Sequence, residues 1–171
     1  MSDHLQIDYW LSRAVAALRA DQTLQDRGYQ LVEIGDLAYG YVPERILEKL
    51  PVLLVSCTGE ITVEDMDLHG EAERYVYPLR VLAVHTFAEA SRVLALKSVV
   101  LGELAGAMRA VQYDGTRFEA PTSLHQFFHI TPEAFEINPD EEAIFDADAG
   151  YQNTYAVAAR YRLTVSSRIE R

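Results

Sequence analysis

The chain has little thiol chemistry and no membrane signal. Its 171 residues include one cysteine, Cys57, which can form no disulfide within the chain and supply no zinc–thiolate site. No uninterrupted apolar run approaches the roughly 18 residues of a membrane helix. The first residues, which include Asp3 and Asp8, lack the basic and then apolar order of a secretory signal. We therefore expect a soluble protein of a reducing compartment.

Metal-binding motifs are incomplete. His125 and His129 are four residues apart, but HQFFH lacks the glutamate of the metalloprotease helix, and its two phenylalanines favour a strand. The run that begins at Asp65 resembles the start of a calcium loop, yet Val76 stands where the bidentate acid is required. We therefore expect no metal site.

Catalytic and phosphate-binding motifs are missing as well. The glycines are isolated, and no Gly-Lys-Ser or Gly-Lys-Thr occurs, so a phosphate-binding loop is excluded. A nucleophile would need a histidine beside Cys57 or a serine, and His85, at the end of an expected strand, is the nearest candidate in chain order. In VLLVSCT, however, Cys57 is typical of a small buried hydrophobic residue. The sequence predicts no catalytic residue, no cofactor and a protein that is not an enzyme.

Acidic residues dominate the charge. The chain has 26 acidic and 15 basic residues, a formal net charge of −11, and two segments without Lys or Arg hold half of the acids. Glu60–Glu73 contains Glu60, Glu64, Asp65, Asp67, Glu71 and Glu73, and Glu133–Asp148 contains Glu133, Glu136, Asp140, Glu141, Glu142, Asp146 and Asp148. Each segment is either a solvated loop or a negative surface that steers a basic partner. The arginines are scattered along the chain, so the sequence shows no basic face for nucleic acid.

The sequence of the N-terminal third predicts two helices and two strands. Asp3–Arg27 has helical spacing of apolar residues, begins with a capping-box pattern and ends at Gly28. Tyr29–Ile34 is expected to be extended, and Pro43–Lys49 a short helix. Pro51–Thr58 is a β-branched apolar run that predicts a buried strand.

The rest of the chain predicts a long helix between strands. Arg74–His85 should pair with the strand near Val52–Cys57, and Thr86-x-x-Glu89 should cap a helix of about 25 residues. A stripe of small residues on this helix predicts a close-packed neighbour: Ala95, Ser98, Gly102 and Gly106.

Regular structure is sparser after this helix. Asp114-Gly115 is typical of a hairpin turn. The region from Ala120 to Tyr151 should be irregular except for His125–Thr131. Tyr155–Ser166 alternates like a long strand, whose free edge would need a partner. We expect one α+β domain over residues 1–171, with a mostly antiparallel sheet flanked by the N-terminal and the long helix, and acidic loops at 60–73 and 133–148.

Three segments carry a resemblance to the tail-terminator and head-to-tail joining proteins of long-tailed bacteriophages. They are PVLLVSCTGE, RYVYPLRVLAVHTFAEASRVL and the terminal YAVAARYRLTVSSR. The resemblance implies an α/β sandwich that assembles into a ring, typically hexameric, which caps the tail tube. It also implies a virion protein assembled in the host cytoplasm, with the tail tube protein and head-completion or connector proteins as partners.

Three functions follow. The first is this ring, with DNA passing through its centre without specific binding, and with Glu60, Glu64, Asp65, Asp67, Glu71 and Glu73 lining the opening or its rim. The second is an acidic DNA-mimic inhibitor of a nucleic-acid enzyme. The third is a small enzyme that uses His85 or His125. We favour the first, because it needs no catalytic residue.

Overall fold

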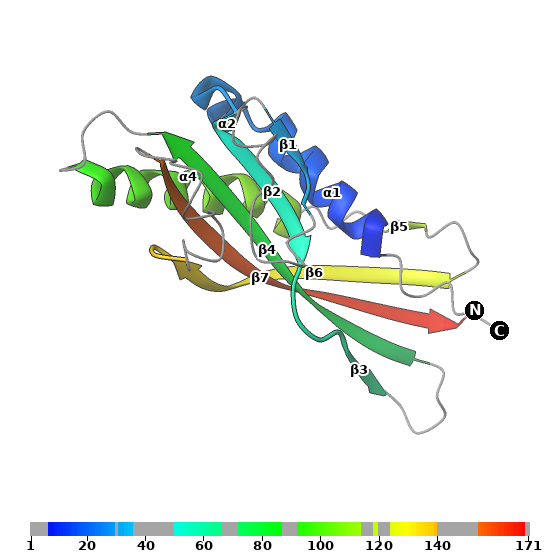
Figure 1. Cartoon of the computed structure of the whole chain (residues 1–171). Coiled ribbons are helices and arrows are strands. Elements are labelled where there is room, and N and C mark those ends of the chain that lie inside the picture. The colour runs from blue at the N-terminus through cyan, green and yellow to red at the C-terminus, as the bar shows by residue number, and fades with distance from the viewer. Residues whose placement is uncertain are drawn as a thin grey trace.

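The computed structural model describes residues 7–29, 31–35, 50–65, 72–86, 92–113, 118–119, 124–139 and 154–169 (Figure 1). Over these residues the chain forms three helices and seven strands. In chain order they are α1 (Ile7–Ala20), α2 (Gln22–Arg27), β1 (Leu31–Ile34), β2 (Val52–Cys57), β3 (Thr62–Asp65), β4 (Ala72–Thr86), α4 (Val93–Tyr113), β5 (Phe118–Glu119), β6 (Leu124–Glu136) and β7 (Thr154–Ile169). The expected Pro43–Lys49 helix and Asp114-Gly115 turn lie outside the described residues.

The described strands form one sheet in the order β1-β2-β4-β7-β6-β5, and β3 pairs with the first half of β4. Only the β1–β2 pair is parallel among these strands. The predicted α+β class with a mostly antiparallel sheet is therefore confirmed. The predicted pairing of β2 with β4 is confirmed too, with Val52 opposite Val84 and Cys57 opposite Leu79.

The terminal strand β7 lies at the centre of the sheet. It pairs along its length with β4 on one side and with β6 on the other, as Figure 1 shows (green, red and yellow arrows). Its sixteen residues extend over roughly 50 Å at the usual rise of about 3.3 Å per residue. The expectation that this strand has a free edge is wrong, because the sequence around residues 124–136 forms a second long strand beside it.

Both long helices pack on one face of the sheet, here called the helix face. Helix α1 packs on β1 and β2, α4 packs on β7 and β6, and the two helices contact each other. Every second residue of each strand points to this face. On neighbouring strands these residues lie opposite one another, as Leu53 does with Ala83 and Ala83 with Val157. Burying these side chains against the helices is the main favourable term in the stability of the fold.

The N-terminal helical segment is broken at Asp21. Helix α1 ends at Ala20, and the Asp21 carboxylate accepts a hydrogen bond from the Leu24 N–H at 3.0 Å, which caps α2. Gly28 ends α2 with a positive φ of 81°, as expected from its position. The prediction of one continuous helix over Asp3–Arg27 is therefore wrong at this point, because an aspartate within a helical pattern can also start a new helix.

The long helix differs from its prediction at its start and on one face. Helix α4 begins at Val93, while Thr86 is the last residue of β4, so Thr86 does not cap this helix. The predicted close-packed stripe is wrong, since Gly102 and Gly106 are exposed and a Cβ built on either meets no neighbour within 4 Å beyond the adjacent backbone of its own helix. The buried face of α4 is instead formed by Lys97, Val100, Leu101, Leu104, Ala107 and Met108.

Two regions expected to be irregular contain strand. The acidic segment Glu60–Glu73 includes β3 and the start of β4, which pair as a hairpin. Strand β6 runs to Glu136, so it extends beyond the expected His125–Thr131 and into the second acidic segment. Pro132 has no backbone N–H to donate to a neighbouring strand. It lies at a register shift in β6, where the regular pairing is already interrupted. Residues 111–113, expected to form one arm of a hairpin, are helical.

Replacing Gly102 with alanine should stabilise the protein. Glycine within an exposed helix costs about 0.5–1 kcal/mol relative to alanine, and a Cβ at this position meets no neighbour. Urea unfolding of Gly102→Ala should show a gain of this size, with Gly106→Ala behaving alike. A loss of stability in both variants would mean that this side of α4 is covered.

Candidate functional site

The face of the sheet opposite the helices, here called the second face, has an apolar end and a charged middle. At one end its side chains are buried and apolar, and they come from β2, β4 and β7: Val52, Leu54, Leu82, Val84, Ala156 and Ala158. None of the described helices packs on this face. Further along β4 and β7 the same alternation places arginines on it.

Four arginines make up what we call the arginine face: Arg74, Arg80, Arg160 and Arg162. Arg80 and Arg160 lie directly opposite each other in the β4–β7 register, and Arg162 lies opposite Pro78. Neighbouring strands are about 4.8 Å apart, so these guanidinium groups share one surface. Like charges opposite each other in a sheet destabilise it unless counter-charges intervene.

Two glutamates supply the counter-charges. Glu136 of β6 accepts hydrogen bonds from Arg80 Nε at 3.2 Å and Nη2 at 3.0 Å, while Arg160 Nε is 4.0 Å from its other oxygen. Glu64 of β3 lies 3.5 Å from Arg74 Nη1 and 4.0 Å from Arg162 Nη2. Four guanidinium groups therefore share two carboxylates, which leaves a net charge of +2 on these six residues.

Two polar atoms on the second face lack hydrogen-bond partners in the part of the chain that the structure describes. Ser56, opposite Arg80 in the β2–β4 register, is 4% exposed, and its Oγ is buried without a partner. The Nε of Arg74 is also buried and without a partner, although Nη1 of the same guanidinium lies near Glu64. Buried polar atoms are normally paired in proteins, so such orphans mark strain or a partner that is not part of the fold.

The candidate channel residues lie in several environments. Glu60 is exposed after β2, and Glu64 lies between Arg74 and Arg162 rather than alone. Asp65 and Glu73 are backbone partners at the end of the β3–β4 hairpin. Asp67 and Glu71 lie outside the described residues. The structure thus brings the first acidic segment up to the arginine face, which the scattered arginines of the sequence did not indicate.

A buried aromatic cluster surrounds His85 on the helix face. The Tyr29 hydroxyl is hydrogen-bonded to His85 Nε2 at 2.6 Å, and the Tyr155 ring stacks on the imidazole at 5.3 Å between centroids. Beside it, Arg27 of α2 forms an ion pair with Glu103 of α4. Burial, together with the positive charge of Arg27, lowers the pKa of His85 to about 4. Burial raises the pKa of the Tyr29 hydroxyl, so both groups are neutral at pH 7.

The nucleophile pair considered from the sequence does not form. Cys57 lies opposite Leu79, six residues along β4 from His85, which is a separation of roughly 20 Å. The Cys57 side chain is half-buried against the core, and burial raises the pKa of its thiol, which lowers its reactivity. His125 and His129 lie in a strand, as predicted, and their side chains are outside the described residues.

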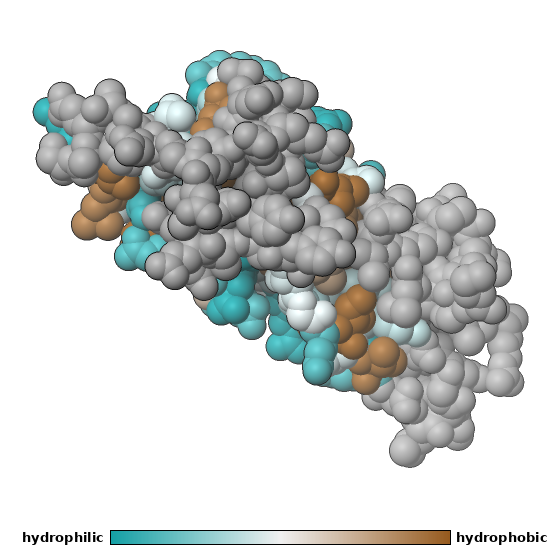
Figure 2. Space-filling view, viewed as in Figure 1, coloured by the Kyte–Doolittle hydropathy of each residue, from teal (hydrophilic) through white to brown (hydrophobic). Residues whose placement is uncertain are grey.

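Large apolar side chains are exposed at several described positions. They include Val63 in β3, Leu94 and Val99 in α4, and Phe135 and Ile137 at the end of β6. Figure 2 shows hydrophobic surface (brown) interspersed with hydrophilic surface (teal) on the side that faces the reader. Such exposure is ordinary for single residues, and it provides contact area where a second molecule binds.

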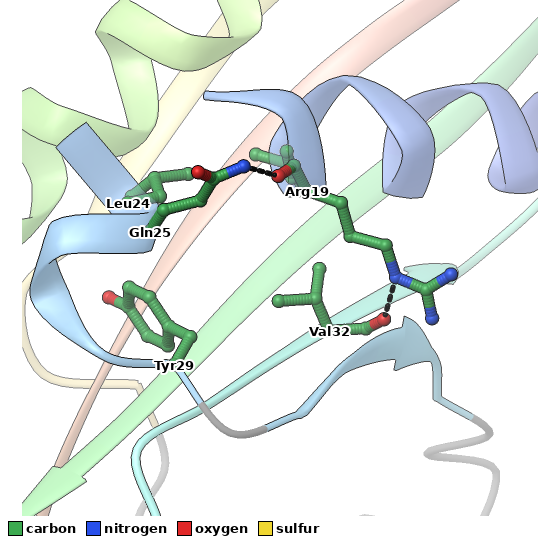
Figure 3. Close-up of a pocket in the computed structure, with 6 residues that line it drawn as sticks. Arg19, Leu24, Gln25, Tyr29 and Val32 are labelled. Carbon is green, nitrogen blue, oxygen red and sulfur yellow. Dashed lines mark hydrogen bonds between the residues drawn. The ribbon is translucent and has the colours of Figure 1, made fainter. Parts of the chain in front are cut away.

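A small hollow lies between α1, α2 and β1. Its volume is about 110 Å³, and Tyr29, Leu24 and Val32 contribute to its wall (Figure 3). The polar groups around it already bond to the backbone, since Arg19 Nε donates to the Val32 carbonyl and Gln25 Nε2 donates to the Arg19 carbonyl. Ligand sites usually enclose about 300–1,000 Å³, so this hollow is too small to hold a cofactor.

Comparison with models of known protein families finds no match, and a search of curated proteins finds none. Within the described residues, no group of three or more His, Cys, Asp or Glu side chains is placed to hold a metal ion. No described helix combines the length and the apolar character needed to cross a membrane. The arginine face is therefore the candidate functional surface on which the proposals below are built.

Proposed function

We propose that this protein is a structural virion protein of a long-tailed phage. It forms a ring, hexameric by the resemblance stated above, which terminates the tail tube and joins it to the head through connector proteins. DNA passes through its centre without specific binding, and the protein uses no catalytic residue and no cofactor. It is assembled in the host cytoplasm and resides in the neck or tail.

The observation that carries this proposal is the architecture. The resemblance implies a mostly antiparallel sheet with flanking helices, and the described residues have this arrangement, with the RYVYPLRVLAVH and YAVAARYRLTVSSR segments as the adjacent strands β4 and β7. Exposed apolar side chains such as Val63 and Phe135 support it further, because a ring offers them a surface against which to be buried.

The acidic segment Glu60–Glu73 lies, in this proposal, at the opening of the ring or its rim. Binding of a duplex depends on Lys and Arg that displace counterions from phosphates, and this segment contains neither. Exposed carboxylates such as that of Glu60 would repel DNA and keep it mobile.

The test is the size and shape of the purified protein. Analytical ultracentrifugation should give a mass that is a multiple of the 19.3 kDa chain, and electron microscopy of the same sample should show rings with a central opening. A chain that stays monomeric up to high micromolar concentration would contradict the proposal. A monomer that binds and inhibits a nucleic-acid enzyme would favour the DNA-mimic function.

A further inference from the structure

The arginine face has the opposite charge to the rest of the chain. Its four arginines and two glutamates, Glu64 and Glu136, carry +2, while the other 11 basic and 24 acidic residues carry −13. A positively charged surface on a negatively charged molecule is complementary in charge to the negative surface of a second copy. Charge complementarity of this kind raises the rate of encounter and fixes the orientation in which two surfaces meet.

The arginines of β7 are held loosely by their present partners. Arg160 and Arg162 each lie 4.0 Å from a carboxylate oxygen, which is beyond hydrogen-bond distance, and their side chains are 47% and 52% exposed. Arg80, by contrast, donates two hydrogen bonds to Glu136 and is mostly buried. Each guanidinium has five N–H donors, so Arg160 and Arg162 can each take up a further carboxylate in a bidentate pair.

The orphaned polar atoms lie on the same surface. Ser56 Oγ and Arg74 Nε are buried on the second face and have no hydrogen-bond partner among the described residues. Ser56 lies on β2 directly opposite Arg80, and Arg74 lies six residues before Arg80 in the first half of β4. Both atoms are inaccessible from outside, so contacts with a second molecule on this face fall to the exposed Arg160 and Arg162.

The charge pattern favours an acidic protein surface over a nucleic acid as the occupant. Phosphate binding needs several cations without counter-charges, whereas two of the four charges here are neutralised by Glu64 and Glu136. The −13 carried by the rest of the chain also repels a polyanion at long range. A second copy of this chain brings the carboxylates that the arginines lack, because outside the arginine face its 24 acidic residues outnumber its 11 basic residues.

We propose that the arginine face binds the acidic surface of a second copy of this chain, an inference that rests on the proposed self-assembly. The two contacting surfaces are different parts of the molecule, so the interface is heterologous. Repetition of a heterologous contact produces a closed ring when the rotation between copies closes, and a filament when it does not. The arginine face is thereby the surface that joins neighbouring copies.

The experiment compares two double charge reversals in the full chain. Arg160→Glu/Arg162→Glu changes the arginine face, and Arg13→Glu/Arg109→Glu makes the same change in charge at exposed positions on α1 and α4. Assembly is measured by sedimentation over a range of protein concentrations and from about 0.05 to 0.5 M salt. We expect the first variant to need a roughly tenfold or higher concentration to assemble, the second to assemble like the wild type, and wild-type assembly to weaken with salt.

Each outcome separates this inference from the proposed function. Wild-type rings together with undiminished assembly of Arg160→Glu/Arg162→Glu would overturn the inference and leave the ring proposal in place. A monomeric wild type would overturn both. If the first variant has an altered unfolding curve, Arg160→Gln/Arg162→Gln replaces it, and equal assembly of that variant and the wild type again overturns the inference. Binding of duplex DNA by the wild type at about 0.15 M salt, lost in the variant, would assign the face to nucleic acid instead.

Discussion

A chain that ends at Tyr155 is expected to be unfolded. The truncation removes β7 except for its first two residues, and β7 lies between β4 and β6 in the centre of the sheet. The helix face then loses the buried side chains of Tyr161, Leu163 and Val165, while long stretches of β4 and β6 lose their backbone partners. Circular dichroism should show no cooperative thermal unfolding for this fragment. Normal folding and assembly of the fragment would show that β7 is not part of the central sheet.

Two neighbouring point substitutions provide a graded form of this test. Leu163 is fully buried on the helix face, and Leu163→Ala should cost about 2–5 kcal/mol through the lost burial and the cavity left behind. Arg162, the preceding residue, points to the second face and is half exposed, so Arg162→Ala should cost less than about 1 kcal/mol. Similar losses in urea unfolding for both variants would mean that the assignment of the two faces of β7 is wrong.

The strands could be predicted because their side chains follow simple rules. In the terminal segment, apolar residues alternate with a second set that contains Arg160 and Arg162, and the structure places these sets on opposite faces of β7. The apolar run near Leu53 and Leu54 is buried on both faces of β2, as its composition indicated. Central strands leave this pattern in the sequence because both of their faces have a fixed environment.

The helix boundaries and the α4 surface were harder to predict. Asp21 interrupts a helical pattern without a proline or glycine, and only the cap geometry reveals the break. A stripe of small residues permits close packing but does not require it, and on α4 the larger Leu101, Leu104 and Met108 decide which side faces the sheet. Local patterns therefore indicated which elements exist. They did not indicate which side of α4 packs on the sheet, because that depends on which side buries more apolar surface.

The arginine face was missed because it depends on strand order. Arg80 and Arg160 come from two strands that are distant in sequence, and they lie opposite each other only because β4 and β7 are neighbours in this register. A signal was present in the alternate arginines of β7, since a strand with Arg at positions two apart presents both on one face. Combining that alternation with the predicted strands would have located half of the surface.

The buried His85 should make the protein less stable as the pH falls below 6.5. The pKa of this histidine is about 4 in the folded chain and near 6.5 in the unfolded chain. Between these values the unfolded chain binds the proton and the folded chain does not, so acid favours unfolding. The stabilisation is present above pH 6.5 and is lost as the pH approaches 4. The full shift is worth roughly 3 kcal/mol, of which roughly 2 kcal/mol is lost between pH 7 and pH 5.

Two substitutions at the His85 cluster isolate this contribution. His85→Gln removes the titrating group. Between pH 7 and pH 5, the free energy of unfolding of this variant should therefore decrease by roughly 2 kcal/mol less than that of the wild type. This difference does not depend on the stability of the variant at pH 7. Tyr29→Phe removes the hydroxyl bonded to Nε2 but keeps the rings that bury the imidazole. It should cost about 1 kcal/mol at pH 7 and retain the pH dependence, because burial is the larger cause of the pKa shift. Urea titrations at several pH values measure both quantities, and an unchanged pH dependence in His85→Gln would show that His85 is accessible to protons in the folded chain.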